Sequence, residues 1–239
     1  AKVVTEYKFR RRTGLTSSAA GFAAITVEAA SAAWLDLSEK DLSILARQGS
    51  GSACRSIPDG FTEWLDGETS ETSYAVSRYR PDYWDLVDVV GVVSSQKKDI
   101  PSSQGHTLAA SSPFYEKRLE LNKTKMQLMK HFLEKKNFPA FGELMEEEAL
   151  ELHAIYITSN PSLIYLLPGT LRVMHAVKRW RADGLAVYLT LNTGQDIHLI
   201  CQKKDAKTVV QLAEEIPDVK KTIINEPTQG AHLIEKHLF

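Results

Sequence analysis

The chain has 239 residues, 43% apolar and 25% charged, and its 29 basic against 30 acidic side chains leave a formal charge of −1. This composition excludes disorder, collagen and fibrous repeats, and the length allows one large domain or two small ones, each with a core. The near-neutral balance argues against a general nucleic-acid or polyanion binder, which normally carries a basic excess on one face. A small anionic ligand is compatible with it.

Neither the apolar runs nor the cysteines indicate a membrane or secreted protein. The best apolar stretch, 86–93, contains Asp88 and is far shorter than the ~20 residues that span a bilayer. The first residues lack the basic-then-apolar layout of a signal peptide. Cys54 and Cys201 are far apart and lie in no CxxC or Cys/His cluster, which argues against a disulfide framework or a zinc site. We therefore expect a cytoplasmic protein with no membrane contact.

The first third of the chain predicts a strand, two helices and then more strands. Alternation predicts a strand over 1–9, and small residues predict a buried helix from Gly14 to about Trp34. A second helix begins at Ser38 and ends at Gly49. Further strands are expected over three ranges that together form an antiparallel meander, followed by a polar loop at 94–106. These ranges are 61–65, 74–79 and 86–93.

The remainder predicts helices followed by a hairpin. Amphipathic helices are expected over 113–136 and 139–153, and another from Pro168 to near Gly184. Strands at 185–191 and 197–201 flank a turn, and a last helix precedes two short strands. That helix covers 206–215, and the strands cover 222–224 and 231–234. Mixed but segregated elements favour an α+β fold, which we divide into domains 1–106 and 107–239.

The segment from Gly14 to Gly21 places a glycine and three hydroxyls at the start of a helix. Free backbone N–H groups and the positive end of the helix dipole favour a phosphate there. An ordinary hydroxyl cap on a buried helix explains the same residues equally well. The segment lacks the Gly-Lys-Ser/Thr of a Walker A loop, so any phosphate site is of another kind.

A second candidate lies in the Gly/Ser-rich run from Gly49 to Arg55. Small residues allow an anion to approach Ser50 and Ser52, and Arg55 can bind a carboxylate or phosphate through two N–H groups. A flexible linker between helices is the alternative, although Cys and Arg are unusual in one. The spacing does not match the Gly-x-Ser-x-Gly of serine hydrolases.

Other polar clusters are weaker candidates. Lys97 and Lys98, with the serines that follow Pro101, could contact phosphate or simply lie in a solvated loop. His232 and His237 lack the further ligands that a metal site requires. The lone histidines at 153 and 198 are more typical of core or surface positions than of catalysts.

Taken in order, these segments resemble the diphosphomevalonate decarboxylase family of the GHMP kinase-like superfamily. The resemblance covers nearly the whole chain and rests on residues 14–22 and 46–56, with supporting segments further on. These are 60–64, 73–76, 92–94, 97–99, 141–144 and 152–154. It implies a two-lobed fold whose cleft binds ATP and 5-diphosphomevalonate. The C3 hydroxyl is phosphorylated, that phosphate leaves, and carbon dioxide is lost to give isopentenyl diphosphate.

The resemblance also implies roles for individual residues. Arg55 matches the arginine that holds the substrate carboxylate, and Ser102 matches a serine that contacts nucleotide or substrate phosphate. The implied catalytic residues are Arg55, Asn192 and Ser18, and the implied substrate-binding residues are Ser50, Ser52, Arg55 and Ser102. The implied ATP-phosphate contacts are Gly14, Ser17, Ser18, Ala19 and Ser102. ATP and Mg²⁺ are the implied cofactors, no protein-bound metal ligand is assigned, and a homodimer is implied.

Two departures from the family pattern leave alternatives open. Residues 1–13 contain no match to the family's Lys-Tyr-Trp-Gly-Lys-like segment with its catalytic lysine, and they carry Arg10-Arg11-Arg12 instead of Pro and small residues. Asn192 occupies the position of an aspartate thought to act on the C3 hydroxyl. The alternatives are an ATP-independent decarboxylase of mevalonate 3,5-bisphosphate, and a noncatalytic phosphate-binding relative or fragment.

Overall fold

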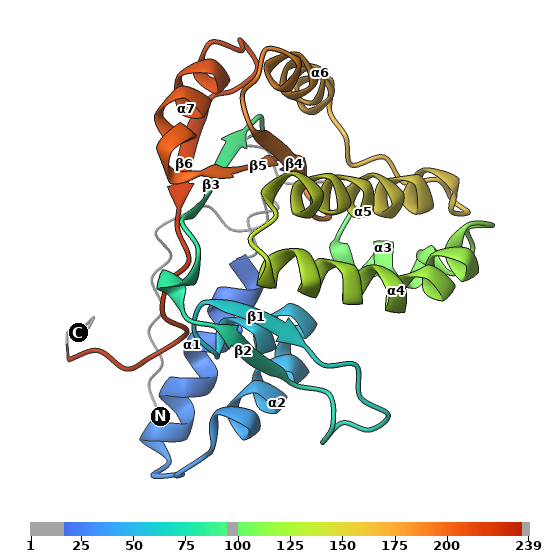
Figure 1. The fold of residues 1–239 in the computed structure, drawn as a ribbon. Coiled ribbons are helices and arrows are strands. Elements are labelled where there is room, and N and C mark those ends of the chain that lie inside the picture. Colours follow the sequence, from blue (N-terminus) through green and yellow to red (C-terminus); the bar gives the residue numbers. More distant parts are fainter. Residues whose placement is uncertain (1–16, 95–99, 236–239) are drawn as a thin grey trace. The chain divides into compact units, whose positions relative to one another are not determined.

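A computed structural model describes residues 17–94 and 100–235, which form two compact units. Unit 1 comprises residues 1–84 and 226–239, and unit 2 comprises residues 85–225. The helices and strands are drawn in Figure 1. Helices and antiparallel sheets are segregated within the chain, so the expected α+β class is confirmed.

The described residues of unit 1 form two α-helices, two short 3₁₀ helices and a two-stranded antiparallel sheet. The elements are α1 (Ser17–Ala32), α2 (Glu39–Gly49), η1 (Gly51–Ser56), β1 (Phe61–Trp64), β2 (Ala75–Tyr79) and η2 (Pro81–Tyr83). Helix α2 begins where the sequence predicted, because the Ser38 side chain accepts a hydrogen bond from the backbone N–H of Asp41. The strand expected at 1–9 lies outside the described residues.

Unit 2 contains a four-stranded antiparallel sheet in the order β4-β5-β3-β6. Its strands are β3 (Leu86–Val92), β4 (Val187–Thr190), β5 (Ile197–Gln202) and β6 (Lys221–Asn225). Its helices are α3 (Ser102–Ala109), α4 (Tyr115–Glu134), α5 (Phe138–Thr158), α6 (Pro168–Ala182) and α7 (Ala206–Glu214), with a 3₁₀ turn, η3 (Lys203–Asp205), before α7.

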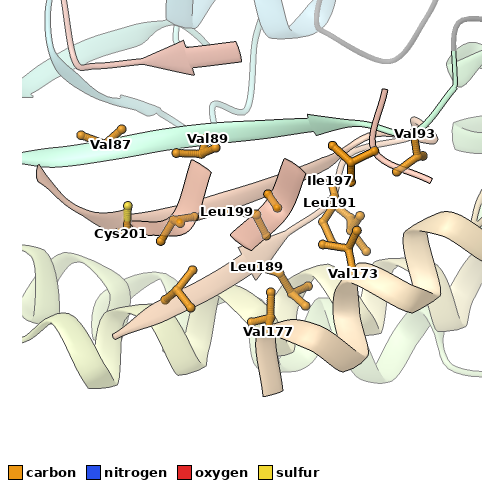
Figure 2. Close-up of a cluster of buried hydrophobic side chains, with 14 of the residues drawn as sticks. Val87, Val89, Val93, Val173, Val177, Leu189, Leu191, Ile197, Leu199 and Cys201 are labelled. Atoms are coloured by element: carbon orange, nitrogen blue, oxygen red, sulfur yellow. The ribbon is translucent and has the colours of Figure 1, made fainter. Parts of the chain in front are cut away.

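The main core of unit 2 lies between the sheet and helices α6 and α7. Val87 and Val89 of β3 and Leu199 of β5 are at most 1% exposed, and Figure 2 shows Val173 and Val177 of α6 among the same cluster. Packing of these branched side chains removes apolar surface from water, which stabilises the fold by roughly 25 cal/mol for each Å² buried. This core fixes the sheet whose β4–β5 turn carries Asn192.

Strand β4 lies at an edge of the sheet, and two charged side chains cover that edge. The Glu146 carboxylate of α5 accepts the backbone N–H of Leu189 at 3.3 Å. Arg181 of α6 donates to the Val187 carbonyl at 3.2 Å and pairs with both Glu146 oxygens, at 2.9 and 3.2 Å. The edge groups of β4 therefore have side-chain partners where a neighbouring strand would otherwise pair.

Three expectations from the sequence were wrong in part. Strands β1 and β2 pair with each other, but β3 joins the other sheet, where it pairs with β5 and β6. Its run, apolar apart from Asp88, is typical of a central strand that is largely buried on both faces. The expected domain boundary at 106/107 would separate β3 from these partner strands.

The two other differences concern local structure. The polar stretch expected as a loop includes α3, whose Gly105 packs so closely on Tyr165 that a Cβ would lie 2.6 Å from the tyrosine hydroxyl. The segment 231–234 forms no strand. Instead, the backbone N–H of Ala231 bonds to the Ser56 carbonyl at 2.8 Å. Tertiary packing overrides local pattern in both places.

Candidate functional site

Small residues bring α1, α2 and η1 close together in unit 1. Ala23, Ala46 and Ala53 are each at most 1% exposed and form one apolar cluster with Ala19 and Ile57. Gly49 lies against the Phe22 ring, where an added Cβ would come within 2.2 Å of a ring carbon. The Gly/Ser-rich run is therefore a packed segment, and the linker interpretation does not fit it.

Ser43 connects this segment to the small sheet. Its side chain is fully buried, and its hydroxyl donates to the Cys54 carbonyl at 3.1 Å while accepting the Ala75 backbone N–H at 2.9 Å. Cys54 is also fully buried, and its thiol donates to the Gly51 carbonyl at 3.1 Å. Burial raises the pKa of the Cys54 thiol, which keeps it protonated. The backbone of η1 is thus held from its buried side.

The polar groups of this segment are less buried than Ser43 and Cys54. The Ser50 hydroxyl donates to the Ser18 hydroxyl at 3.3 Å, which joins the end of α2 to the first turn of α1. Ser52 is partly buried and Arg55 is exposed. Within the described part of the chain, no carboxylate pairs with the Arg55 guanidinium. Two hydroxyls from distant positions in the sequence therefore meet near the end of a helix.

The other phosphate-site residues have different placements. Ala19 is 4% exposed, so only its backbone is suited to contact a ligand. Ser17 begins α1, but its side chain lies outside the described residues, as does all of Gly14. Lys97 and Lys98 also lie outside them.

Unit 2 brings together Ser102 and the turn after β4. Ser102 begins α3, and its hydroxyl lies 2.6 Å from the Thr193 hydroxyl. Thr193 directly follows Asn192, whose side chain is exposed. The structure thus places two of the sequence-predicted residues, Ser102 and Asn192, at one end of unit 2.

Three further side chains hold the same turn. His153 of α5 donates from Nε2 to the Asn192 carbonyl at 3.1 Å, and Thr170 of α6 donates to the Gln195 carbonyl at 2.7 Å. Asp196 Oδ1 accepts the backbone N–H groups of Val93 and Ser94 at 3.0 and 3.4 Å. The turn that carries Asn192 is therefore tied to α3, α5, α6 and the end of β3.

Burial shifts the pKa of two of these groups. His153 is 2% exposed, and desolvation lowers its pKa although the hydrogen bond to the Asn192 carbonyl opposes the change. Asp196 is also 2% exposed, and desolvation raises its pKa against the effect of the two backbone N–H bonds. At neutral pH the His153 ring is thus uncharged.

No sequence pattern indicated a role for Ser43, Thr170, Thr193 or Asp196. The one local signal was the position of Thr193 beside Asn192. His198, expected as an ordinary core or surface residue, bonds from Nδ1 to the Asp88 carboxylate at 2.9 Å. In the described ranges, no group of three or more His, Cys, Asp or Glu side chains is arranged to hold a metal ion, and none of the helices is long and apolar enough to cross a membrane.

Comparison with known families agrees with the fold. Residues 1–75 match the diphosphomevalonate decarboxylase-like N-terminal domain, and residues 88–236 match the mevalonate 5-diphosphate decarboxylase C-terminal domain. Two units of this kind define a GHMP kinase-like α+β protein. More narrowly, the chain belongs to the diphosphomevalonate decarboxylase family.

Curated relatives and solved structures give the extent of the similarity. The diphosphomevalonate decarboxylase of Candida albicans is 33% identical over 215 residues, which are 88% of this chain and 59% of the relative. That of Aspergillus fumigatus is 32% identical and covers 87% of this chain and 53% of its own length. The chain thus spans little more than half the length of these curated relatives.

Two solved structures superpose closely on the chain. The mevalonate diphosphate decarboxylase of Staphylococcus aureus is 34% identical with a TM-score of 0.88, covering 93% of this chain and 68% of its own. A structure of MDDEF in complex with MVAPP, AMPPCP and magnesium is 31% identical, also with a TM-score of 0.88, and covers 95% and 70%.

Proposed function

We propose that the protein decarboxylates a phosphorylated mevalonate, converting 5-diphosphomevalonate and ATP to isopentenyl diphosphate, ADP, phosphate and carbon dioxide in isoprenoid precursor synthesis. The main support is the segment from Ser50 to Arg55. The buried Ser43 holds its backbone through the Cys54 carbonyl, while its hydroxyls are partly exposed and its guanidinium is exposed. Family membership and the relatives solved with MVAPP support it.

The chemistry requires a group that holds the substrate carboxylate while C3 loses its phosphate. Arg55 can donate two N–H groups to that carboxylate and orient the breaking C–C bond, since it has no competing ion pair in the described residues. Ser50 and Ser52 can donate to the diphosphate, as neutral groups that need no charge compensation. These roles remain those implied by the family pattern.

The first turn of α1 fits the phosphates of ATP. Its backbone N–H groups lack partners within the helix, and the Ser18 hydroxyl stands beside that of Ser50. Ser102, at the start of α3, is the corresponding phosphate contact proposed for unit 2. The described residues offer no group of three or more His, Cys, Asp or Glu side chains for Mg²⁺, so the phosphates of ATP and the substrate would supply most of its ligands.

Asn192 favours a second candidate, an ATP-independent decarboxylase of mevalonate 3,5-bisphosphate. An amide cannot remove the proton of the C3 hydroxyl, and it supplies no negative charge. A substrate that already carries the 3-phosphate needs neither, but it still needs the carboxylate and phosphate contacts. The exposed amide of Asn192 is suited to such a substrate as a hydrogen-bond donor.

The direct test is release of carbon dioxide from 5-diphosphomevalonate and from mevalonate 3,5-bisphosphate, each with and without ATP and Mg²⁺. Turnover of the diphosphate only with ATP supports the leading proposal. Turnover of the bisphosphate without ATP supports the second candidate. If no carbon dioxide is released under any of the four conditions, both proposals fail for this chain, and a fragment or a noncatalytic phosphate-binding relative is indicated.

The Asn192→Asp variant sharpens this test. If ATP-dependent turnover rises, the amide limits an otherwise intact phosphoryl-transfer site. If turnover of the bisphosphate continues without ATP and the diphosphate gains nothing, the second candidate stands. Asn192→Ala is the matched control, because it removes the amide without supplying a charge.

We also propose that the protein is a cytoplasmic homodimer. Family membership supports the dimer, and the two buried free thiols, Cys54 and Cys201, suit a reducing compartment. Native mass measurement of the purified protein tests the assembly state, and a monomer mass across the micromolar range would contradict the dimer.

A further inference from the structure

His153 is a buried polar side chain that the proposed chemistry does not use. It lies on α5 at 2% exposure, and its ring meets Tyr156 and Tyr165 edge-on, at centroid distances of 6.0 and 6.4 Å. Its Nε2 lies 3.1 Å from the backbone carbonyl of Asn192, which is 39 positions away in the sequence. The two tyrosine rings therefore fix the plane of the His153 imidazole, which contacts Asn192.

The hydrogen-bond partners define the form of the ring. A carbonyl oxygen can only accept, so Nε2 must carry the proton. Nδ1 is buried and has no hydrogen-bond partner within the described residues. A second N–H at Nδ1 would be a buried donor without an acceptor, which costs more than an unused lone pair. This environment therefore favours the neutral tautomer, in which the proton is on Nε2.

We infer that His153 is a positioning residue for Asn192, which it holds through the Nε2–H bond to the backbone carbonyl. The inference rests on the proposed function for its effect on decarboxylation. Thr193 and Gln195 are tied to α3 and α6 by their own hydrogen bonds, whereas His153 bonds to residue 192 itself. Loss of this bond releases the peptide from which the Asn192 side chain projects.

Three substitutions of His153 distinguish the effect of losing the hydrogen bond from the effect of changing the volume of the side chain. Glutamine can place an N–H donor near the position of Nε2, while asparagine carries the same amide on a chain too short to reach it. Leucine fills the space without a donor. Gln and Asn share the cost of burying an amide, so a difference between them reports the placement of the donor.

The expected result is a split between kcat and KM. His153→Leu and His153→Asn lower kcat about 10- to 100-fold with KM unchanged, because a small displacement of a reacting group costs this much. His153→Gln restores most of kcat. Equal losses in Gln and Asn, or full activity in Leu, would overturn the inference. Thermal denaturation of each variant verifies that the compared proteins are folded.

A second measurement does not depend on catalysis. In the unaltered protein labelled with ¹⁵N-histidine, the ring signals that disappear in His153→Gln are expected to show a protonated Nε2 and an unprotonated Nδ1 at neutral pH. A protonated Nδ1 would overturn the inference. If the unaltered protein releases no carbon dioxide from either substrate, the proposed function fails, and this spectrum still tests the tautomer that the bond to residue 192 requires.

Discussion

The two candidate segments are held in different ways. In unit 1 the run from Gly49 to Ser56 is fixed by close packing of alanines and glycines and by one buried serine, Ser43. In unit 2 the turn after Asn192 is fixed by side chains from three helices and by the end of β3. Packing of small residues can be recognised in the sequence, because those residues are close together along the chain. Long-range hydrogen bonds cannot be recognised in this way, because their partners are far apart in the sequence.

The difference also suggests how each segment tolerates change. A packed segment depends on volume, because added atoms at Gly49 or Ala53 have no space to enter. A segment tied by several hydrogen bonds loses one contact at a time, so single substitutions weaken it in steps.

Arg55→Ala gives the largest effect on activity, because it removes the accessible charged group of the packed segment. We expect kcat/KM for decarboxylation to fall about 100-fold or more, the scale for losing a donor that stabilises charge in the reaction. The control is Arg78→Ala, which removes an arginine of β2 that pairs with Glu63. Unchanged carbon dioxide release by Arg55→Ala would contradict the carboxylate-binding role.

Ser43→Ala gives the largest effect on stability. The substitution leaves the Cys54 carbonyl and the Ala75 N–H buried without their partner, so we expect the free energy of unfolding to fall by about 1–3 kcal/mol. Urea denaturation measures this loss. Ser31→Ala, an exposed serine of α1, is the control and is expected to stay within about 0.5 kcal/mol. A similar small change in Ser43→Ala would show that packing alone holds η1.

A double-mutant cycle on Ser102 and Thr193 measures one tie of the unit 2 turn. For Ser102→Ala and Thr193→Val we expect a coupling of about 0.5–1.5 kcal/mol in the free energy of unfolding, since their hydroxyls lie 2.6 Å apart. The control cycle pairs Ser102→Ala with Thr107→Val, whose hydroxyl bonds elsewhere, to the Ser103 carbonyl. Additive behaviour in the first cycle would mean that the contact contributes nothing to the turn.

The smallest effect is a pH dependence near the same turn. Burial opposes the charged form of His198, but the Asp88 hydrogen bond and charge, with Asp196 nearby, outweigh it and raise the pKa of His198 above 6.5. A raised folded-state pKa means that this stability is present below pH 6.5 and is lost as the pH rises through the folded value. Denaturation across this range should show the decline, and Asp88→Asn should flatten it. A steeper decline in Asp88→Asn would contradict the assignment.

Much of the fold could be predicted from the sequence because periodicity is a local property. The amphipathic pattern located α4 and α5, Ser38 marked the start of α2, and alternation located the β4–β5 hairpin. The partners of β3 could not be found this way. A run that is mostly apolar does not say which strands lie beside it, and β5 and β6 are more than a hundred positions away.

The candidate site shows the same limit. Ser50, Ser52 and Arg55 were visible as a compositional signal in one stretch of chain, and the structure shows that stretch to be packed. His153 is also visible in the sequence, but nothing near it indicates its bond to residue 192. Hydrogen bonds between distant positions are set by the tertiary fold, so their residues carry no local pattern that could be recognised.

The charged cover of strand β4 has a consequence for association between chains. An open edge is a template on which a strand from another molecule can add, and here Glu146 and Arg181 already use the Leu189 donor and the Val187 acceptor. An incoming strand would have to displace both a carboxylate and a guanidinium that neutralise each other. Helices α5 and α6 thus prevent a strand of another chain from pairing with β4. A condition that separates these helices from β4 would expose this edge and promote aggregation.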